Sequence, residues 1–260
     1  MLPYLVQSLF LAVAAFIGGV INSVAGGGGF IAFPALIAAG LLPIQANATN
    51  TVALWPGQFT SIAGYREEVR KNLRLVLPVV TVAAIGGFAG SWTLLHHSQN
   101  SFLRLVPYLF LLGSTSFALS GPISSRIKAR AAADAGASQR IYLAPLLFLL
   151  LCITYYIGYF GAGAGLLTMS ALALCGVERI AEINALKTVI TTVANLVAVL
   201  MFIAYRAVDW RFCWFMMITC AIGGYTGARN SPRISDRVLR PIIITLGFLI
   251  AIWFFTHRTL

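Results

Sequence analysis

The chain alternates long apolar runs with short polar connections over its whole length. A helix that crosses the roughly 30 Å hydrocarbon core of a bilayer needs about 20 mainly apolar residues. Two runs are too short for this, because helices of their length reach only about 20 Å. The pattern predicts an all-α polytopic membrane protein of about ten transmembrane segments, two of them short or interrupted. The eight long runs cover 3–23, 47–64, 73–95, 102–120, 141–158, 185–205, 210–230 and 238–257, and the two short ones cover 29–42 and 165–177.

The second half of the chain repeats the layout of the first. The motif AIGGFAG at 84–90 recurs as AIGGYTG at 221–227, and NATNT at 47–51 recurs as NALKT at 184–188, so both pairs share one offset along the chain. The glycine-rich GGGGF recurs as GAGAGL at nearly the same offset. We therefore predict two membrane repeats of five segments, residues 1–120 and 141–260, joined by a cytoplasmic linker at 121–140. An odd number of crossings in each repeat would place the second repeat upside down in the membrane.

Composition and charge support membrane insertion. Hydrophobic residues make up 59% of the chain and charged residues only 10%, with a mean hydropathy of +0.88. The net charge of +11 comes from Lys and Arg clustered between apolar runs, which is typical of cytoplasmic loops and does not indicate a nucleic-acid partner. We expect an integral membrane protein in contact with lipid, and the oligomeric state is left open, a homodimer included.

The distribution of cations separates two topologies. With ten crossings and the N-terminus outside, fourteen of the 18 cations face the cytoplasm. With eight crossings, the N-terminus inside and the two short segments re-entrant, the split falls to eleven against seven. Because an excess of cytoplasmic cations sets orientation, the ten-crossing topology is favoured.

The inverted arrangement also predicts the chemistry of the ligand. Helices that begin near residues 29, 47, 165 and 184 would direct four N-termini inward. Each carries about half a positive charge and unpaired N–H groups, so together they would bind a small anion. The candidate substrate-binding residues are Asn22, Ser23, Gly26, Gly27, Gly28, Gly29, Asn47, Asn50, Thr51, Gln58, Gly161, Gly163, Gly165, Asn184, Lys187, Thr188 and Asn195.

Two stretches resemble the signatures of one family. The sequence INSVAGGGGFIAFPALIAAGLLPIQANATNTVALWPGQFTSIAGYRE at 21–67 is similar to the first-repeat signature of the TauE/SafE family of membrane transporters. The sequence GYFGAGAGLLTMSALALCGVERIAEINALKTVITTVANLVAV at 158–199 is similar to the second. The resemblance covers nearly the whole chain and implies export of sulfite, a related sulfur oxyanion or an organosulfonate across the bacterial inner membrane. It does not fix the anion, and we expect no cofactor, bound metal or enzymatic activity.

Structural alternatives apply to several candidates. Glycine runs often serve only close helix packing, which is how we interpret AIGGFAG and AIGGYTG. Asn47 and Asn184 are good N-caps, and Thr51 and Thr188 can bond back to the preceding turn. The amides of Gln58 and Asn195 lie near the bilayer centre, where they would either join helices or bind ligand; their symmetric placement favours ligand binding.

The sequence leaves alternatives open for the coupling ion and for the class of activity. All seven carboxylates lie in loops or near helix ends, so a proton would travel on the substrate itself or through Glu182 at the mouth of the site. A passive anion channel with the same site remains an alternative. An intramembrane enzyme is disfavoured, because no histidine lies in the middle of an apolar segment and no HExxH motif occurs.

Lys187 stands where the first repeat has Asn50. We expect the two residues on opposite sides of the membrane, Asn50 toward the outside and Lys187 toward the cytoplasm. A cation in the first turn of a helix opposes the helix dipole, so Lys187 needs a further reason. One is snorkelling to the interface or pairing with Glu182. The other is a cytoplasmic anion trap beside the glycines at 26–29.

Overall fold

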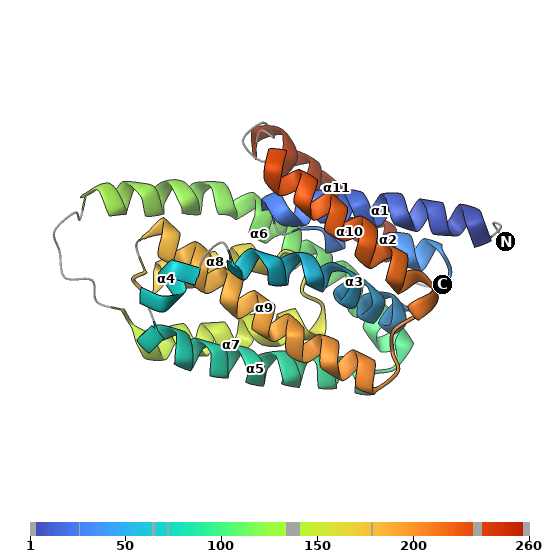
Figure 1. Cartoon of the computed structure of the whole chain (residues 1–260), viewed down its shortest axis with the longest axis horizontal. Coiled ribbons are helices and arrows are strands. Elements are labelled where there is room, and N and C mark those ends of the chain that lie inside the picture. The colour runs from blue at the N-terminus through green and yellow to red at the C-terminus, as the bar shows by residue number, and fades with distance from the viewer. Residues whose placement is uncertain are drawn as a thin grey trace.

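Every element in the described part of the chain is a helix (Figure 1). The computed structural model describes residues 4–25, 27–63, 66–71, 73–133, 141–177, 179–230 and 236–256. The helices are α1 (Tyr4–Ala25), α2 (Gly29–Ala38), α3 (Pro43–Ala63), α4 (Arg66–Lys71), α5 (Leu73–His96), α6 (Gln99–Ala133), α7 (Leu143–Tyr159), α8 (Ala164–Leu174), α9 (Ile180–Ala204), α10 (Trp210–Asn230) and α11 (Asp236–Thr256).

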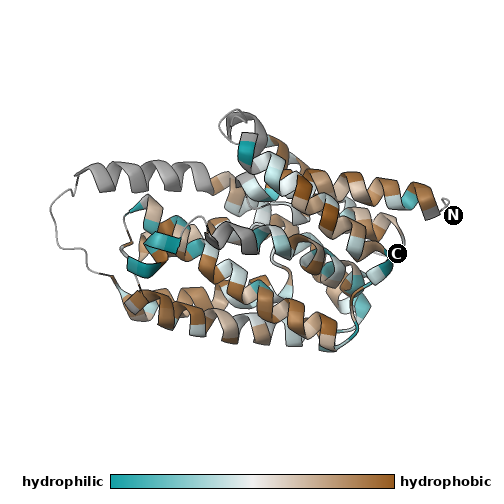
Figure 2. Cartoon of the chain, viewed as in Figure 1, coloured by the Kyte–Doolittle hydropathy of each residue, from teal (hydrophilic) through white to brown (hydrophobic). Residues whose placement is uncertain are grey.

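Several helices have the length and apolarity of membrane spans. Among the described residues, Leu5–Ser23, Leu75–His96, Gln99–Leu119 and Ala181–Ala204 qualify at full length. Shorter apolar helices cover Gly29–Ala38, Leu143–Tyr159, Ala164–Leu174 and Pro241–Thr256. Large apolar side chains also lie on the outer surface, where Leu5 and Leu77 are 80% and 72% exposed, and Figure 2 shows hydrophobic colour along the helices. Such a surface fits lipid, so the chain is a polytopic helical membrane protein.

Two predicted helix starts are wrong. The helices expected to start at residues 47 and 184 begin earlier, α3 at Pro43 and α9 at Ile180. In α3 the cap comes from another helix: the Oε1 atom of Gln99 accepts the N–H of Ile44 at 2.8 Å. The predicted linker at 121–140 is helical in its first part, because α6 continues to Ala133 through a run rich in Ala, Arg and Lys, which favour helix without being apolar.

The helices of the two halves correspond along the chain. The starts of α3 and α9, of α5 and α10, and of α6 and α11 are each separated by the same offset as the repeated motifs. The packing corresponds as well: α1 packs on α10 as α7 packs on α5, and α3 packs on α10 as α9 packs on α5. Two helices also pack directly against their own counterparts in the other half: α3 against α9, and α6 against α11.

The counterparts α3 and α9 run in opposite directions (Figure 1). Near the start of α9, Arg179 forms an ion pair at 3.1 Å with Glu68 of α4, which follows the end of α3. Beyond the end of α9, the N–H of Asp209 donates to the Oγ1 atom of Thr49 near the start of α3, at 2.9 Å. Each end of α9 therefore lies beside the opposite end of α3.

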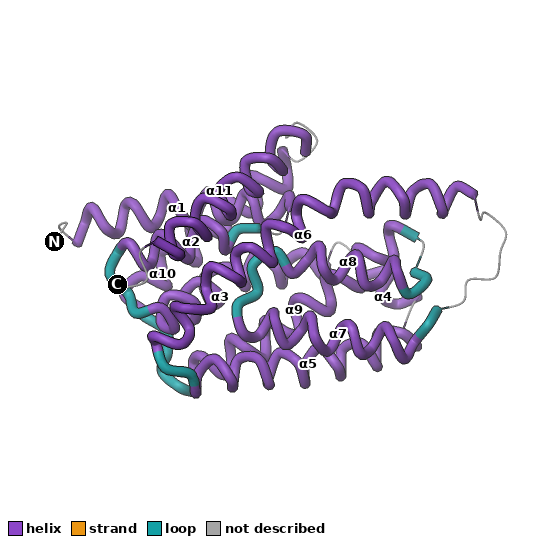
Figure 3. Tube along the Cα trace, turned by 180° about the vertical axis from the view of Figure 1, so that it is seen from behind, coloured by secondary structure: helices purple, strands orange, loops and turns teal. Residues whose placement is uncertain are grey.

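The short helices α2 and α8 turn back beside the helices that precede them. The 17 residues of α7 extend about 26 Å, and the 11 residues of α8 return about 17 Å. The N–H of Tyr142, before α7, donates to the carbonyl of Cys175, after α8, at 3.0 Å, so the hairpin closes at the end of the bundle where it began. Figure 3 shows the loop between α7 and α8 inside the bundle, between helices. The interruption thus places a helix start in the protein interior.

The two AIGG motifs form packing seams, as predicted. Added Cβ atoms on Gly86 and Gly90 of α5 would collide with α7, and those on Gly223 and Gly227 of α10 would collide with α1. Each seam lets the two backbones approach closely, which is a common use of small residues between membrane helices.

Candidate functional site

The helical path is interrupted before α2 and again before α8, and these two interruptions, called the breaks below, lie next to each other in the protein interior. A Cβ atom on Gly29, the first residue of α2, would lie 3.7 Å from the Cβ of Ala162 in the other break. Gly113 of α6 lies between them: its added Cβ would be 2.9 Å from the carbonyl oxygen of Ala162 and 2.6 Å from the ring of Phe30. Among the described helices, the N-termini that converge here are those of α2 and α8. The four-terminus expectation is wrong, because α3 and α9 begin several residues before Asn47 and Asn184.

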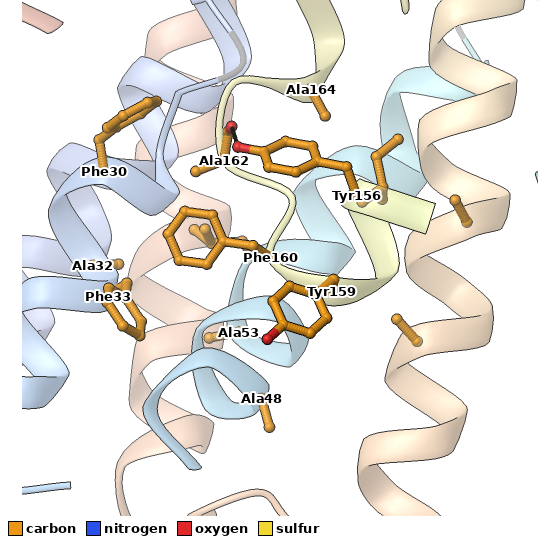
Figure 4. Close-up of a cluster of buried hydrophobic side chains, with 14 of the residues drawn as sticks. Phe30, Ala32, Phe33, Ala48, Ala53, Tyr156, Tyr159, Phe160, Ala162 and Ala164 are labelled. Atoms are coloured by element: carbon orange, nitrogen blue, oxygen red, sulfur yellow. Dashed lines mark hydrogen bonds between the residues drawn. The ribbon is translucent and has the colours of Figure 1, made fainter. Parts of the chain in front are cut away.

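The break before α8 depends on its glycines and on a buried tyrosine. Gly161 and Gly163 have φ of +79° and +77°, a left-handed conformation that glycine adopts without the steric penalty of a side chain. The hydroxyl of Tyr156 donates to the carbonyl of Ala162 at 2.6 Å and also lies 3.3 Å from the carbonyl of Leu109 (Figure 4). This hydroxyl satisfies the Ala162 carbonyl in the interruption and also contacts a carbonyl of the continuous helix α6.

Asn47 stabilises the same break from α3. Its Nδ2 atom donates to the carbonyl of Tyr159 at 3.2 Å, and the side chain is only 1% exposed. The hydroxyl of Tyr159 lies 2.8 Å from Nδ1 of His97, which follows α5. Asn47 is thus a tertiary contact in the second turn of α3, not the N-cap that the sequence suggested.

Aromatic side chains surround the breaks on one side. The rings of Phe30, Phe33, Phe110 and Phe160 are all buried, and Phe33 and Phe160 contact edge to face with centroids 5.5 Å apart. Figure 4 shows Phe30 and Phe33 on α2 beside Phe160 of the break. This packing fixes the position of the α2 and α8 starts without adding polar groups.

Asn50 faces the start of α2 with an unsatisfied amide. Its side chain is 5% exposed, and the Nδ2 atom lies 3.3 Å from the position that a Cβ on Gly29 would take. The Oδ1 atom is buried and finds no hydrogen-bond partner among the described residues. A buried amide oxygen without a partner is costly unless a hydrogen-bond donor such as water completes it.

Lys187 occupies the corresponding place at the start of α8. Its Cδ atom lies 3.9 Å from the position of a Cβ on Gly165, so its chain runs beside the α8 N-terminus. Lys187 is half-buried, and the described residues supply no ion pair and no hydrogen bond to its ammonium group. The alternative of pairing with Glu182 is therefore not realised.

Two expectations about the position of Lys187 are wrong. It lies in the third turn of α9, seven residues after Ile180, so it does not oppose the first-turn dipole. It also lies beside Gly165 of the second glycine run, whereas the first run faces Asn50 through Gly29. Each helix start therefore faces the third helix of its own half, α3 or α9, because each short helix folds back against that helix.

Gln58 and Asn195 bond to each other. Nδ2 of Asn195 donates to Oε1 of Gln58 at 2.9 Å and to the carbonyl of Thr191 at 3.0 Å. The indole N–H of Trp55 also donates to the carbonyl of Thr192 at 3.3 Å. Both contacts across the two helices join residues 137 positions apart, so counterpart residues meet at the crossing of α3 and α9. Of the two roles considered for these amides, joining helices or binding ligand, the structure shows the first.

The other predicted residues fall into three groups. The hydroxyls of Thr51 and Thr188 bond back to the carbonyls of Asn47 and Asn184, at 2.9 and 2.8 Å, the local alternative named above. Ser23 is exposed and bonds to its own helix, so it lies apart from the breaks. An added Cβ atom on Gly27 would collide with Phe117, and one on Gly28 would collide with Gly18 and Asn22, so both glycines are closely packed. Gly26 lies outside the described residues.

The sequence missed one residue relevant to the site, Tyr156, and did not predict the burial of a second, Glu182. Tyr156 gives no local signal, since it stands in an apolar run and its partner Ala162 is defined only by the break. Glu182 was placed near a helix end, which is correct, but it is only 4% exposed. The constant offset between the halves could have indicated the contact of Gln58 with Asn195, because residues near a twofold axis meet their counterparts.

The fold, the apolar exterior and the polar residues at interrupted helices define a polytopic membrane transporter. The family model described as "Sulfite exporter TauE/SafE" matches residues 11–254, and the chain belongs to this family. No solved structure matches the chain.

Curated relatives have the same general character. "Probable membrane transporter protein ORF9" of Sinorhizobium sp is 25% identical over 246 residues, covering 94% of this chain and 90% of the relative. "Probable membrane transporter protein YfcA" of Escherichia coli (strain K12) is 25% identical over 251 residues, covering 94% and 89%. A "Probable membrane transporter protein" of Haemophilus influenzae is 24% identical over 238 residues, covering 90% and 89%.

Proposed function

We propose that this protein is a secondary transporter that exports a small anion, namely sulfite, a related sulfur oxyanion or an organosulfonate. The family description supports the substrate class. The single observation that carries the anion site is Lys187, a half-buried cation beside the α8 N-terminus with no anionic partner among the described residues. A negatively charged ligand there would supply the missing partner.

The substrate site lies at the two interior helix starts. Lys187 beside Gly165 forms its cationic half, and Asn50 beside Gly29 forms its neutral half. The free N–H groups of α2 and α8 add partial positive charge to both halves. The chemistry is binding and release of the anion, with no cofactor and no bond made or broken in the substrate.

The architecture is that of two inverted repeats, residues 1–120 and 141–260, with the linker 121–140 in the cytoplasm. Equal offsets of the helix starts, matching packing partners and the opposed directions of α3 and α9 support this arrangement. Contact between counterpart residues, as in Gln58 with Asn195, is expected close to a pseudo-twofold axis in the membrane plane.

The orientation places Lys187 toward the cytoplasm and Asn50 toward the outside of a bacterial inner membrane. Cations of α4 and Arg179 share one end of the bundle, which is the cytoplasmic end by the positive-inside rule. Figure 1 shows the start of α1 and the end of α11 at the opposite end, which supports an N-terminus on the outer side. An anion from the cytoplasm then meets the cationic half first, which suits export.

Transport and binding assays test this function. Purified protein is heated with sulfite, thiosulfate, sulfoacetate, taurine or acetate, and proteoliposomes are assayed for uptake of the same compounds. We expect the sulfur oxyanions to raise the melting temperature and to enter the vesicles, whereas neutral sugars do neither. Stabilisation by divalent cations alone would contradict the anion site. Accumulation above equilibrium, driven by a second ion, distinguishes the transporter from a passive channel, which supports only downhill flux.

A further inference from the structure

The counterpart helices α3 and α9 differ in charge. No residue of α3 is charged, whereas α9 carries Glu182 and Lys187. At the offset that relates the two halves, α3 has Gln45 and Asn50 in their places. Because the two helices pack in corresponding ways, the fold does not require either charge. Lys187 belongs to the proposed anion site, which does not include Glu182.

Glu182 is a buried carboxylate without a counter-ion. It lies in the first turn of α9 and is 4% exposed. No residue in the described ranges donates a hydrogen bond to it or forms an ion pair with it. The neighbouring Arg179 pairs instead with Glu68 at 3.1 Å, and Glu68 also binds Lys71 at 3.1 Å. A buried carboxylate that lacks partners is costly in its charged form, and a bound proton removes that cost.

The surroundings of Glu182 contain few other charges. Arg179 on its own helix and Glu68 on α4 act on it electrostatically. The sequences of α3, α7 and α8, which pack against α9, contain no acidic or basic residue, and α5 contributes only Arg74 and His96 at its two ends. Within the part of the chain that the structure describes, which excludes Glu178, the charge state of Glu182 depends mainly on Arg179, Glu68 and the ligand at Lys187. The remaining charged residues of α4, which also packs on α9, are Arg66, Glu67, Arg70 and Lys71.

Glu182 and Lys187 are close enough to influence each other without touching. Five residues apart on one helix, they are separated by about 7.5 Å along the axis and by about 140° around it. An anion at Lys187 and a charged Glu182 would therefore repel across roughly 10 Å. At an effective dielectric of about 20, this repulsion weakens anion binding on the order of tenfold.

We propose that Glu182 is the proton site of this transporter, so that a proton on Glu182 and an anion at Lys187 bind together. The inference rests on the proposed anion transport and adds its coupling ion. By linkage, protonation strengthens anion binding by the same factor by which the anion strengthens protonation. Each transport cycle then moves one proton in the same direction as the anion.

The test uses thiosulfate, which does not change its charge near neutral pH. Its affinity for the purified full-length protein is measured by thermal stabilisation at mildly acidic and mildly basic pH. We expect binding to be about tenfold tighter on the acidic side in the wild-type protein. The Glu182→Gln variant, which carries the residue type of Gln45, should bind tightly at both pH values. The control Glu67→Gln alters an exposed carboxylate of α4 and should keep the wild-type dependence.

Proton movement provides the second readout. In proteoliposomes that contain a pH-sensitive dye, thiosulfate entry should acidify the interior with the wild-type protein and not with Glu182→Gln. Thiosulfate binding that is equally tight at both pH values in the wild type overturns the inference, even if the variant does not fold. An equal pH dependence in wild type and Glu182→Gln overturns it as well. Absence of any anion binding or flux at either pH instead refutes the proposed function.

Discussion

Replacing Lys187 with glutamine tests the cationic half of the site directly. The side chain is half-buried beside Gly165, and no described acidic residue neutralises it, so its removal breaks no internal ion pair. A hydrogen bond to a charged group contributes about 1 to 3 kcal/mol in proteins. Its loss should raise the half-saturating substrate concentration on the cytoplasmic side roughly 5- to 150-fold. The melting temperature without ligand should stay near that of the wild type.

The assay is anion flux against substrate concentration on the cytoplasmic side of oriented vesicles. Lys187→Arg should retain part of the affinity, because the charge remains while the geometry changes. Arg206→Gln is the matched control, since it removes an exposed cation just beyond the other end of α9. An unchanged half-saturation in Lys187→Gln would refute a substrate role and leave Lys187 as a structural cation near the membrane boundary.

Three further changes test how the interior is built. Tyr156→Phe removes the hydrogen bond to the Ala162 carbonyl in the break before α8. It should lower the free energy of unfolding, measured by denaturation in detergent, by about 1 to 3 kcal/mol. An unchanged free energy of unfolding would show that this hydrogen bond adds no stability. Gly163→Ala should destabilise by about 1 kcal/mol or more because of its positive φ, whereas Gly165→Ala has open space and should fold normally; equal stability of the two variants would contradict this. A double-mutant cycle replacing Gln58 and Asn195 by leucine should give a coupling of about 0.6 kcal/mol and no more than about 2 in the unfolding free energy, and a zero coupling would show that their bond adds no stability.

The close packing of glycines limits what some substitutions can report. A valine at Gly28 would collide with the backbone of Gly18 in α1, and one at Gly163 would meet Gly113 while also needing a left-handed backbone. Loss of transport in either variant would follow from misfolding as readily as from a lost ligand contact. Gly165→Ala is the more informative change, because its added Cβ has only the Lys187 chain within 4 Å, at 3.9 Å.

The sequence determined the helical class, the order of the segments and the correspondence of the two halves. In a bilayer each segment must satisfy its own backbone hydrogen bonds, so a local run of apolar residues is sufficient to specify a helix. The glycine runs also marked both interruptions, and the constant offset between the repeated motifs matched Asn50 with Lys187. These features are written within about 20 consecutive residues, or repeated at a fixed spacing, and can be read directly.

The tertiary structure alone decided which partners these residues have. The N–H of Ile44 is capped by Gln99, and the break before α8 is bound by Asn47 at its Tyr159 carbonyl, 112 residues along the chain. Glu182 is buried although it lies in a first helical turn and its neighbours Arg179 and Ala181 are exposed. Side-chain hydrogen bonds and burial depend on atoms brought together from distant segments, and a linear pattern contains no signal for which helices will meet.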